Sequence, residues 1–417
     1  MSNGTNITLL IGTQLKLQVY QHWDPLKVCI VGACWPPEAF AYIQDSKLRS
    51  IFERIAIETE EDLAALTAFL EQRGVTVLRP DVSRWEHLEF KGEMPMPPVT
   101  PRDYHIMIGD TFYYSSTWKR VVYADHFDEW PGWNRFYQDI RQPDWPSCAH
   151  ERDFVNLPKR IQDTVYDCGY LRIRNSEWYR MAEKYTNPVG VFDSIYKYIE
   201  HCGNIRKHTL HHEFVNGSMV TRVGRDLFFA TEWYGGVTNG LSMIAQEISG
   251  KQFRPHIIDT GGHSDGTFCP VAPGLIISYH DQTTYEKSFP GWEVVYGSDR
   301  SFLETVADWR ELRKWGYGRY YLQGQEQSPQ LADFLDKYMK DWTGNAVETK
   351  FFVNILMVDP KTAVVSQYDE NVVRAMERYG ITCHVLPLRH QFFWDAGTHC
   401  HTCDLDREGE QQDWFKN

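Results

Sequence analysis

The sequence predicts an α/β fold made of repeated strand-and-helix units that close around an axis. Two segments, residues 58–80 and 370–387, share one plan in which a helical pattern leads through a glycine turn into an apolar strand. Four other segments have the pattern of a hairpin, in which a short polar turn joins two apolar strands. Units of this kind bury their apolar faces only against neighbours, and proteins built from them usually close around an axis.

The first helical segment carries signals for its start and its end. Apolar side chains recur at helical spacing over residues 63–70, and Gly74 follows as a stop signal. Thr59 with Asp62 three residues later is typical of an N-terminal cap, so we expect the helix to begin near Thr59. Gly380 ends the second helical segment in the same way.

Four hairpins and one further strand define the array. The hairpins are residues 105–114, 221–230, 270–278 and 354–365, and an apolar strand at residues 27–32 precedes them. Their spacing is irregular, and we expect the largest insertion around residues 118–170, which are rich in Trp, Asp and Pro. We expect one domain over residues 1–417, with turns from distant parts of the chain meeting at one mouth.

Composition argues against several classes of function. Lys and Arg number 43 against 56 Asp and Glu, a net charge of −13, which disfavours nucleic-acid binding and a polybasic membrane-surface protein. No apolar stretch reaches the ~18 residues of a membrane-spanning helix, and the N-terminus lacks an export signal. Nine cysteines, an odd number, are typical of reduced thiols. We therefore predict a cytoplasmic protein.

The C-terminal run at residues 397–404 offers either a metal site or an activated thiol. Cys400 and Cys403 have the spacing of two zinc ligands, but zinc needs two more, and the sequence has no second C-x-x-C. The complement that the sequence offers is a histidine cluster, made of His208, His211 and His212. We favour the thiol and predict no metal.

Three other short segments carry candidate polar side chains. Within residues 261–267, His263 and Asp265 are two positions apart, so in an extended segment they point to the same face. Asp103 lies just before the first hairpin, and Asn216 lies in a turn signal before the second. Taken singly, each is more often a simple turn or a loop ion pair. Together with the C-terminal run, they form four segments in one order, and that order is informative.

The order resembles the amidinotransferase family, which includes glycine amidinotransferase and the inosamine-phosphate amidinotransferases. Blocks spread over nearly the whole chain carry the resemblance. They are residues 23–26 (WDPL), 28–32 (VCIVG), 58–80, 101–103 (PRD), 263–267 (HSDGT), 354–359 (NILMVD) and 399–404 (HCHTCD).

The resemblance implies a fold and a chemistry. The fold is the five-bladed α/β propeller, or pentein fold, and the reaction moves an amidino group from arginine or a related guanidine to a primary amine without a cofactor. Cys400 would be the nucleophile, and His263 would exchange protons with the leaving and incoming amines. Asp103 and Asp265 would hold the planar guanidinium through charge-assisted hydrogen bonds.

The chain departs from the family pattern near the substrates. Asn216 stands where the family has an acidic partner for the histidine, and an amide can orient the His263 ring without offsetting its charge. Gln282 and Glu348 stand where the family anchors the arginine carboxylate, which Glu348 would repel. A threonine and two glycines at residues 260–262 indicate a roomier acceptor pocket.

The sequence alone leaves three functions open. The first is an amidinotransferase that takes a small guanidine donor and an amine acceptor. The second is a guanidine hydrolase on the same scaffold, in which water resolves the intermediate and gives a ureido product. The third is a guanidine- or amine-binding protein that has lost catalysis, which the departures at Asn216, Gln282 and Glu348 favour. The oligomeric state is also open, a homodimer included.

Overall fold

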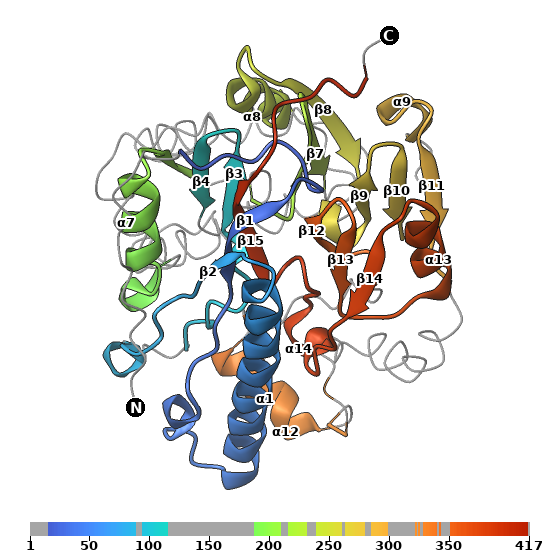
Figure 1. Cartoon of the computed structure of the whole chain (residues 1–417). Helices are drawn as coiled ribbons and strands as arrows, with labels where there is room; N and C mark the ends of the chain where they lie inside the picture. Colours follow the sequence, from blue (N-terminus) through green and yellow to red (C-terminus); the bar gives the residue numbers. More distant parts are fainter. Residues whose placement is uncertain are drawn as a thin grey trace.

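Five three-stranded sheets make up the described part of the chain. The structure is a computed structural model that describes residues 16–88, 94–115, 187–209, 216–231, 239–260, 263–279, 285–298, 328–339 and 351–415, with positions 322, 324, 325 and 342. In each sheet the central strand pairs antiparallel with one neighbour and parallel with the other. The repeated α/β units predicted from the sequence are therefore confirmed as five blades (Figure 1).

The strands are assigned to the blades as follows. The first blade contains β15 (Thr402–Arg407), β1 (Leu26–Val31) and β2 (Thr76–Leu78), and the second contains β3 (His105–Ile108), β4 (Thr111–Ser115) and β5 (Ile205–Thr209). The third contains β6 (Val220–Val223), β7 (Asp226–Thr231) and β8 (Arg254–Asp259). The fourth contains β9 (Phe268–Ala272), β10 (Leu275–Ser278) and β11 (Glu293–Tyr296), and the fifth contains β12 (Leu356–Asp359), β13 (Thr362–Val365) and β14 (Thr382–Val385).

Helices connect the second and third strand of each blade. They are α1 (Ser46–Glu71), α7 (Asp193–His201), α8 (Asn239–Ser249), α9 (Tyr285–Ser288) and α13 (Glu370–Arg378). In the described ranges, two further α-helices, α12 (Pro329–Tyr338) and α14 (Gln391–Trp394), precede β12 and β15. Short 3-10 helices are η1 (Pro37–Phe40), η2 (Trp85–His87), η3 (Pro101–Asp103), η4 (Pro188–Gly190) and η5 (Ser264–Gly266).

All four predicted hairpins are present, as β3–β4, β6–β7, β9–β10 and β12–β13. The early strand predicted at residues 27–32 is β1. It pairs with β15 on one side and β2 on the other, so strands from both ends of the described chain share one blade. Figure 1 shows β1 and β15 side by side near the middle of the molecule. The insertion predicted around residues 118–170 lies outside the described residues.

Helix α1 begins thirteen residues earlier than the capping signal at Thr59 predicted. Its cap is Asp45, whose side chain accepts hydrogen bonds from the amides of Lys47 and Leu48. The Thr59 hydroxyl lies inside the helix and accepts a hydrogen bond from the indole of Trp394 at 2.9 Å. A residue type that favours a helix start is here used for a tertiary contact, so the expected start was wrong. The expected stop is confirmed, because the chain turns at Gly74 with φ of +79°.

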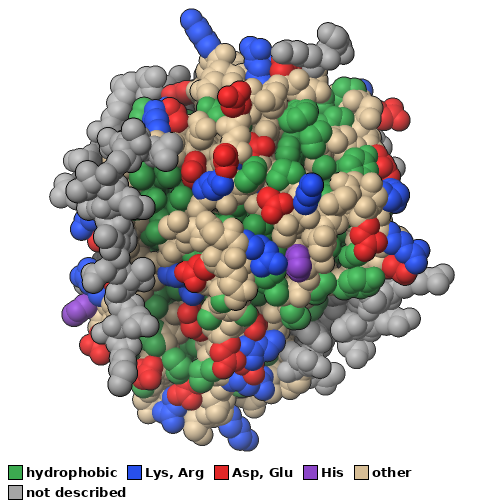
Figure 2. Space-filling view, in the orientation of Figure 1, with side chains coloured by type: hydrophobic (Ala, Val, Ile, Leu, Met, Phe, Trp, Pro, Cys, Tyr) green, Lys and Arg blue, Asp and Glu red, His purple; other side chains and the backbone are tan. Residues whose placement is uncertain are grey.

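The apolar side of α1 packs against the first blade and against the segment that leads into β15. Phe52 and Leu63 of this helix belong to one buried hydrophobic cluster with Val31 of β1 and Trp394 of α14. Acidic and basic side chains are interspersed with apolar ones on the face shown in Figure 2. Among the residues that the structure describes, no helix is both long and apolar enough to cross a bilayer.

A buried ion cluster joins the blades at their inner strands. The carboxylate of Asp404 in β15 accepts hydrogen bonds from the guanidinium groups of Arg102, Arg222 and Arg407 at 2.6–2.9 Å. The side chains of all four residues are at most 1% exposed. Three cations facing one anion leave the cluster with an excess of positive charge, which Asp404 alone cannot balance.

The same arginines also bond backbone carbonyls of other blades. Arg222 in β6 donates to the carbonyl of Met107 in β3 at 2.5 Å, and Arg407 in β15 donates to the carbonyl of Met357 in β12 at 2.9 Å. Their planar groups have several N–H donors in fixed directions, which suits them to bridging a carboxylate and carbonyls at once. The cluster therefore ties four blades to one point.

We expect Asp404→Asn to lower the free energy of unfolding by about 3–5 kcal/mol, because three guanidinium groups would lose their buried counter-charge. Chemical denaturation of the purified variant measures this loss. Glu370→Gln is the matched control, since it neutralises an acid paired with Arg374 on the exposed side of α13, where the side chains are 57% and 69% exposed. The control should change stability by less than about 1 kcal/mol. Equal midpoints for the two variants would contradict the role assigned to Asp404.

Candidate active site

The candidate residues lie in the segments that lead into the inner strands of different blades. The placements are Cys400 before β15, His263 and Asp265 at η5 before β9, Asp103 at the end of η3 before β3, and Asn216 before β6. Four of the five blades therefore contribute the turn that precedes the strand pairing antiparallel with the central strand, β15, β3, β6 or β9, as expected for turns that meet at one mouth.

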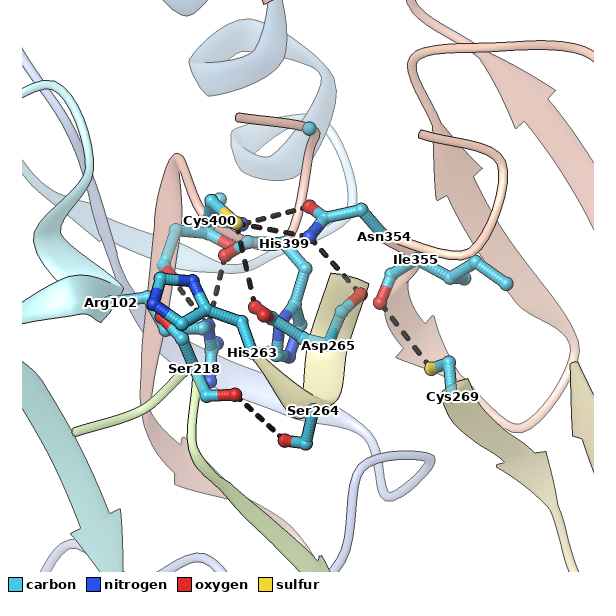
Figure 3. Close-up of polar contacts among 12 residues, drawn as sticks. Arg102, Ser218, His263, Ser264, Asp265, Cys269, Asn354, Ile355, His399 and Cys400 are labelled. Atoms are coloured by element: carbon cyan, nitrogen blue, oxygen red, sulfur yellow. Dashed lines mark hydrogen bonds and ion pairs between the residues drawn. The ribbon is translucent and has the colours of Figure 1, made fainter. Parts of the chain in front are cut away.

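Cys400 is held by a carboxamide and lies beside a carboxylate (Figure 3). The side-chain nitrogen of Asn354 donates to Sγ of Cys400 at 3.0 Å, and the side-chain oxygen of Asn354 accepts from the backbone amide of Cys400, also at 3.0 Å. Sγ lies 3.5 Å from Oδ2 of Asp265. The cysteine is 1% exposed, so its thiol meets these groups in a buried environment.

Asp265 has one oxygen in use and one without a partner. Its Oδ2 also accepts a hydrogen bond from Nδ1 of His399 at 2.7 Å. Its Oδ1 is buried and has no hydrogen-bond partner among the described residues. A buried, unpaired carboxylate oxygen is energetically costly, which makes Oδ1 a natural acceptor for a ligand N–H.

The environment of Asp265 favours its neutral form more than water does. Burial raises the pKa of this carboxyl to about 6, although the charges of His263 and Arg102 act to lower it. The nearby charge of Asp103 adds to the increase. These opposing effects also show that His263 and Asp103 lie within electrostatic reach of Asp265.

His263 precedes η5, and Figure 3 draws its side chain in the group that contains Cys400 and Asp265. The backbone carbonyl of His263 accepts a hydrogen bond from the hydroxyl of Thr267 at 3.0 Å, which holds the start of the η5 turn. The structure thus brings the predicted nucleophile, the predicted histidine and the two predicted aspartates to one place.

Asp103 is oriented by the turn that precedes β6. Its Oδ1 accepts a hydrogen bond from the hydroxyl of Ser218 at 2.6 Å. Gly217 brings the two segments together, because its amide donates to the carbonyl of Arg102 at 2.9 Å. A Cβ at Gly217 would lie 2.5 Å from both Cγ of Arg102 and the carbonyl oxygen of His105. Only glycine allows this approach.

Asn216 closes the turn that precedes β6. Its side-chain oxygen accepts hydrogen bonds from the backbone amides of Ser218 and Met219, both at 2.9 Å. Both lone pairs of that oxygen are therefore used to close the turn. The pairing of Asn216 with His263 stays a prediction.

Several expectations fall outside the described residues. These are Gln282 and Glu348, the two histidines His211 and His212, and residues 261–262 of the acceptor region. They stay predictions. Within the ranges that the structure describes, no group of three or more His, Cys, Asp or Glu side chains is placed to hold a metal ion.

Two residues of the site were not singled out from the sequence. Asn354 was treated as the first residue of a strand block, and His399 as a neighbour of the cysteine. Arg102 holds the segment around Cys400, because its Nε donates to the carbonyls of His399 and Thr402. Asn354 lies just before β12 and gives no local signal in the sequence, since its partners Asp265 and Cys400 are 89 and 46 positions away.

Comparisons with known proteins find amidinotransferases that are similar over nearly the whole chain. No family model matches the sequence. The chain is 22% identical over 428 residues to the mitochondrial glycine amidinotransferase of Gallus gallus, covering 95% of this chain and 84% of that protein. It is 21% identical over 425 residues to inosamine-phosphate amidinotransferase 1 of Streptomyces griseus, covering 95% of this chain and 98% of that protein. The chain is related to the amidinotransferase family.

A solved amidinotransferase structure supports the fold. The inosamine-phosphate amidinotransferase of Streptomyces griseus superposes with a TM-score of 0.55 at 18% identity, over 95% of this chain and 99% of that one. At this identity the likeness concerns the fold, and it agrees with the five blades found here. This amidinotransferase relative therefore has the five-bladed α/β propeller, or pentein fold, that its sequence predicted.

We expect Gly217→Ala to lower the free energy of unfolding by roughly 1–3 kcal/mol, because the added methyl group would push against a backbone carbonyl that cannot move freely. Thermal or chemical denaturation measures the effect. Ser218→Ala is the comparison, since it removes the hydrogen bond to Asp103 without adding an atom. An unchanged melting temperature for Gly217→Ala would show that the close approach of the two segments is not required.

Proposed function

We propose that the chain is a cysteine-dependent amidinotransferase that acts on a small guanidine donor and a primary amine acceptor. The observation that carries the proposal is the meeting of a buried thiol, Cys400, with the carboxylate of Asp265 that has one unpaired oxygen. A guanidinium group is a planar cation with N–H donors, and carboxylates are its natural partners. A thiol beside that cation is placed to attack the guanidinium carbon.

Donor binding would change the charge balance of the site. In the free protein, Asp103 and Asp265 oppose ionisation of the neighbouring thiol, because like charges disfavour each other. A bound guanidinium would pair with Oδ1 of Asp265 and with Asp103, and its positive charge would favour the thiolate of Cys400. Arginine is the donor that we propose, since it is the common biological molecule with this group.

In the first half-reaction, the thiolate of Cys400 would attack the guanidinium carbon and form a C–S bond. The bond from that carbon to the donor amine would then break, and His263 would give the departing amine a proton. The product of this step is ornithine when the donor is arginine, together with an amidino group bound to Cys400.

In the second half-reaction, the acceptor amine would lose a proton to His263 and attack the amidino carbon. The C–S bond would break, which returns the thiolate and releases a new guanidine. No net oxidation or reduction occurs and no external group is needed, so we propose no cofactor. If ammonia left in place of the donor amine, and water then resolved the intermediate on Cys400, arginine would give citrulline, a ureido product, and the protein would be a hydrolase instead.

Cellular location and assembly stay predictions. We place the activity in the cytoplasm, although the vertebrate relative is named as a mitochondrial protein. A homodimer is the assembly that we would test first, since a reaction between two small molecules requires no second kind of protein.

Intact-protein mass spectrometry after incubation with arginine and no acceptor tests the proposal. We expect a mass gain of one amidino group, which Cys400→Ala abolishes. Cys403→Ala is the matched control, because this thiol is also buried but bonds the carbonyl of His105 rather than the site residues. The Cys403 variant should keep the adduct.

Three outcomes separate the candidate functions. Adduct formation followed by transfer to added amines supports the amidinotransferase. Accumulation of citrulline with arginine alone would identify a hydrolase. Binding of arginine without adduct and without turnover would identify a guanidine-binding protein and would contradict the proposal.

The pH dependence of turnover reports on Asp265. Its raised pKa means that the carboxyl is mainly ionised at pH 7 and mainly protonated below about 6, where it loses its attraction for a guanidinium. We therefore expect kcat/KM for arginine to fall by about tenfold per pH unit below this value. In kcat the same limb should lie at lower pH, because the bound cation favours the carboxylate.

Two variants show which group causes this limb. Asp265→Asn should lower kcat/KM and remove the acid limb together, since the amide does not titrate. Asp103→Asn should lower kcat/KM but keep a limb. An acid limb that survives in Asp265→Asn would assign the titration to another group.

A further inference from the structure

The side chain of Asn354 makes two hydrogen bonds with Cys400, and the proposed mechanism gives this residue no role. The residue is completely buried, at 0% exposed, and lies just before β12 in the fifth blade. Its side chain joins the segment of Cys400 to the η5 turn, because the nitrogen that donates to Sγ also lies 3.3 Å from the backbone carbonyl of Asp265. One carboxamide therefore bridges two elements of the site (Figure 3).

The orientation of this carboxamide is fixed by its neighbours. The backbone amide of Cys400 can only donate, so the Asn354 atom that faces it must be the oxygen. The other atom is then the nitrogen, and the groups that it faces, Sγ of Cys400 and the carbonyl of Asp265, are acceptors. All of these contacts are satisfied by one orientation and broken by the flipped one.

The approach of Asn354 depends on a glycine in the nucleophile segment. A Cβ at Gly397 would lie 2.6 Å from Cβ and 2.7 Å from Oδ1 of Asn354. The backbone of Asn354 contributes as well, since its carbonyl accepts from the amide of His399 at 3.4 Å. The segment that carries Cys400 is therefore packed directly onto this one side chain.

We propose that Asn354 is a further catalytic residue, whose side-chain N–H favours the thiolate form of Cys400 over the thiol already before the donor binds. The proposal takes from the proposed function only that Cys400 is the nucleophile. A hydrogen bond strengthens when its acceptor becomes charged, so the N–H donor stabilises the thiolate more than the thiol. This contribution opposes the neighbouring carboxylates and is present in the free protein.

Asn354→Asp separates the two contacts of the side chain. The variant keeps an oxygen to accept from the Cys400 amide, but it replaces the donor that faces Sγ with a second oxygen. Loss of the N–H bond and repulsion between the charges should raise the thiol pKa of Cys400 by about one to two units. The fraction of thiolate at neutral pH should fall about tenfold or more.

Ultraviolet thiolate absorbance, followed against pH without substrate, measures this change. Each protein is compared with its own Cys400→Ala counterpart, so that the difference reports on Cys400 alone. The charged and titratable groups around the thiol are present in both proteins of each pair, so their own absorbance changes cancel in the difference. These groups are His263, Asp265, Arg102, Asp103, His399 and His401.

Two controls keep the result interpretable. Asn204→Asp makes the same change at another buried asparagine, which bonds the carbonyls of Leu17 and Asp110 in the second blade, and it should leave the Cys400 titration unchanged. Asn354→Ala removes donor and acceptor together, so it should raise the thiol pKa and also lower the melting temperature.

Coincident titrations for the wild type, Asn354→Asp and Asn354→Ala would overturn the proposal. The measurement needs no turnover, so it is separate from the test of the proposed function. A shifted titration in a chain that transfers no amidino group would reject the amidinotransferase and keep the role of Asn354.

Discussion

The carboxylate of Asp404 and the three guanidinium groups around it are the interaction on which the rest of the structure depends. Arg222 and Arg407 bond carbonyls in other blades, so the inner strands are fixed to one buried point. Arg102 belongs to the same cluster and also bonds the carbonyls of His399 and Thr402 on either side of Cys400. The ion pairs that hold the blades together therefore also set the position of the thiol. The excess positive charge of the cluster lies next to the acids of the site, and Arg102 lowers the pKa of Asp265 against the effect of burial.

The site is built from turns rather than from one element. In each blade a short turn leads into the strand that pairs antiparallel with the central strand. The polar and thiol side chains of the site lie in these turns: Asp103, Ser218, Asp265, Asn354 and Cys400. Because each turn is anchored to a buried strand, the side chains are held by the sheets and not by the loops alone. Glycines allow the turns to approach each other, as Gly217 does beside Arg102 and Gly397 does beside Asn354. Small residues at these points are therefore part of the site geometry.

Local patterns in the sequence predicted what depends on neighbours along the chain. The hairpins, the strand β1 and the helix stop at Gly74 are short-range features, and all are present. The ordered blocks carry the resemblance to amidinotransferases, and that resemblance implies the roles of Cys400, His263, Asp103 and Asp265. Contacts between distant segments could not be predicted in this way. Thr59 is a residue type that favours a helix cap, but its hydroxyl bonds the indole of Trp394, and the side-chain oxygen of Asn216 bonds two backbone amides of its own turn. Asn354 shows no local signal because its partners come from other blades.

The first blade has a consequence for how the molecule is made. Strand β15 inserts beside β1, which lies more than 370 residues earlier in the chain, and Cys400 stands two residues before β15 begins. A polypeptide emerging from the ribosome therefore lacks both the closing strand and Cys400 until almost all of the described chain has been synthesised. Pairing between such distant segments is slow compared with local folding, since the entropy of closing a long loop must be met first. Closure of the first blade and completion of the candidate site are thus one event, and a partly made chain carries the other four blades without Cys400.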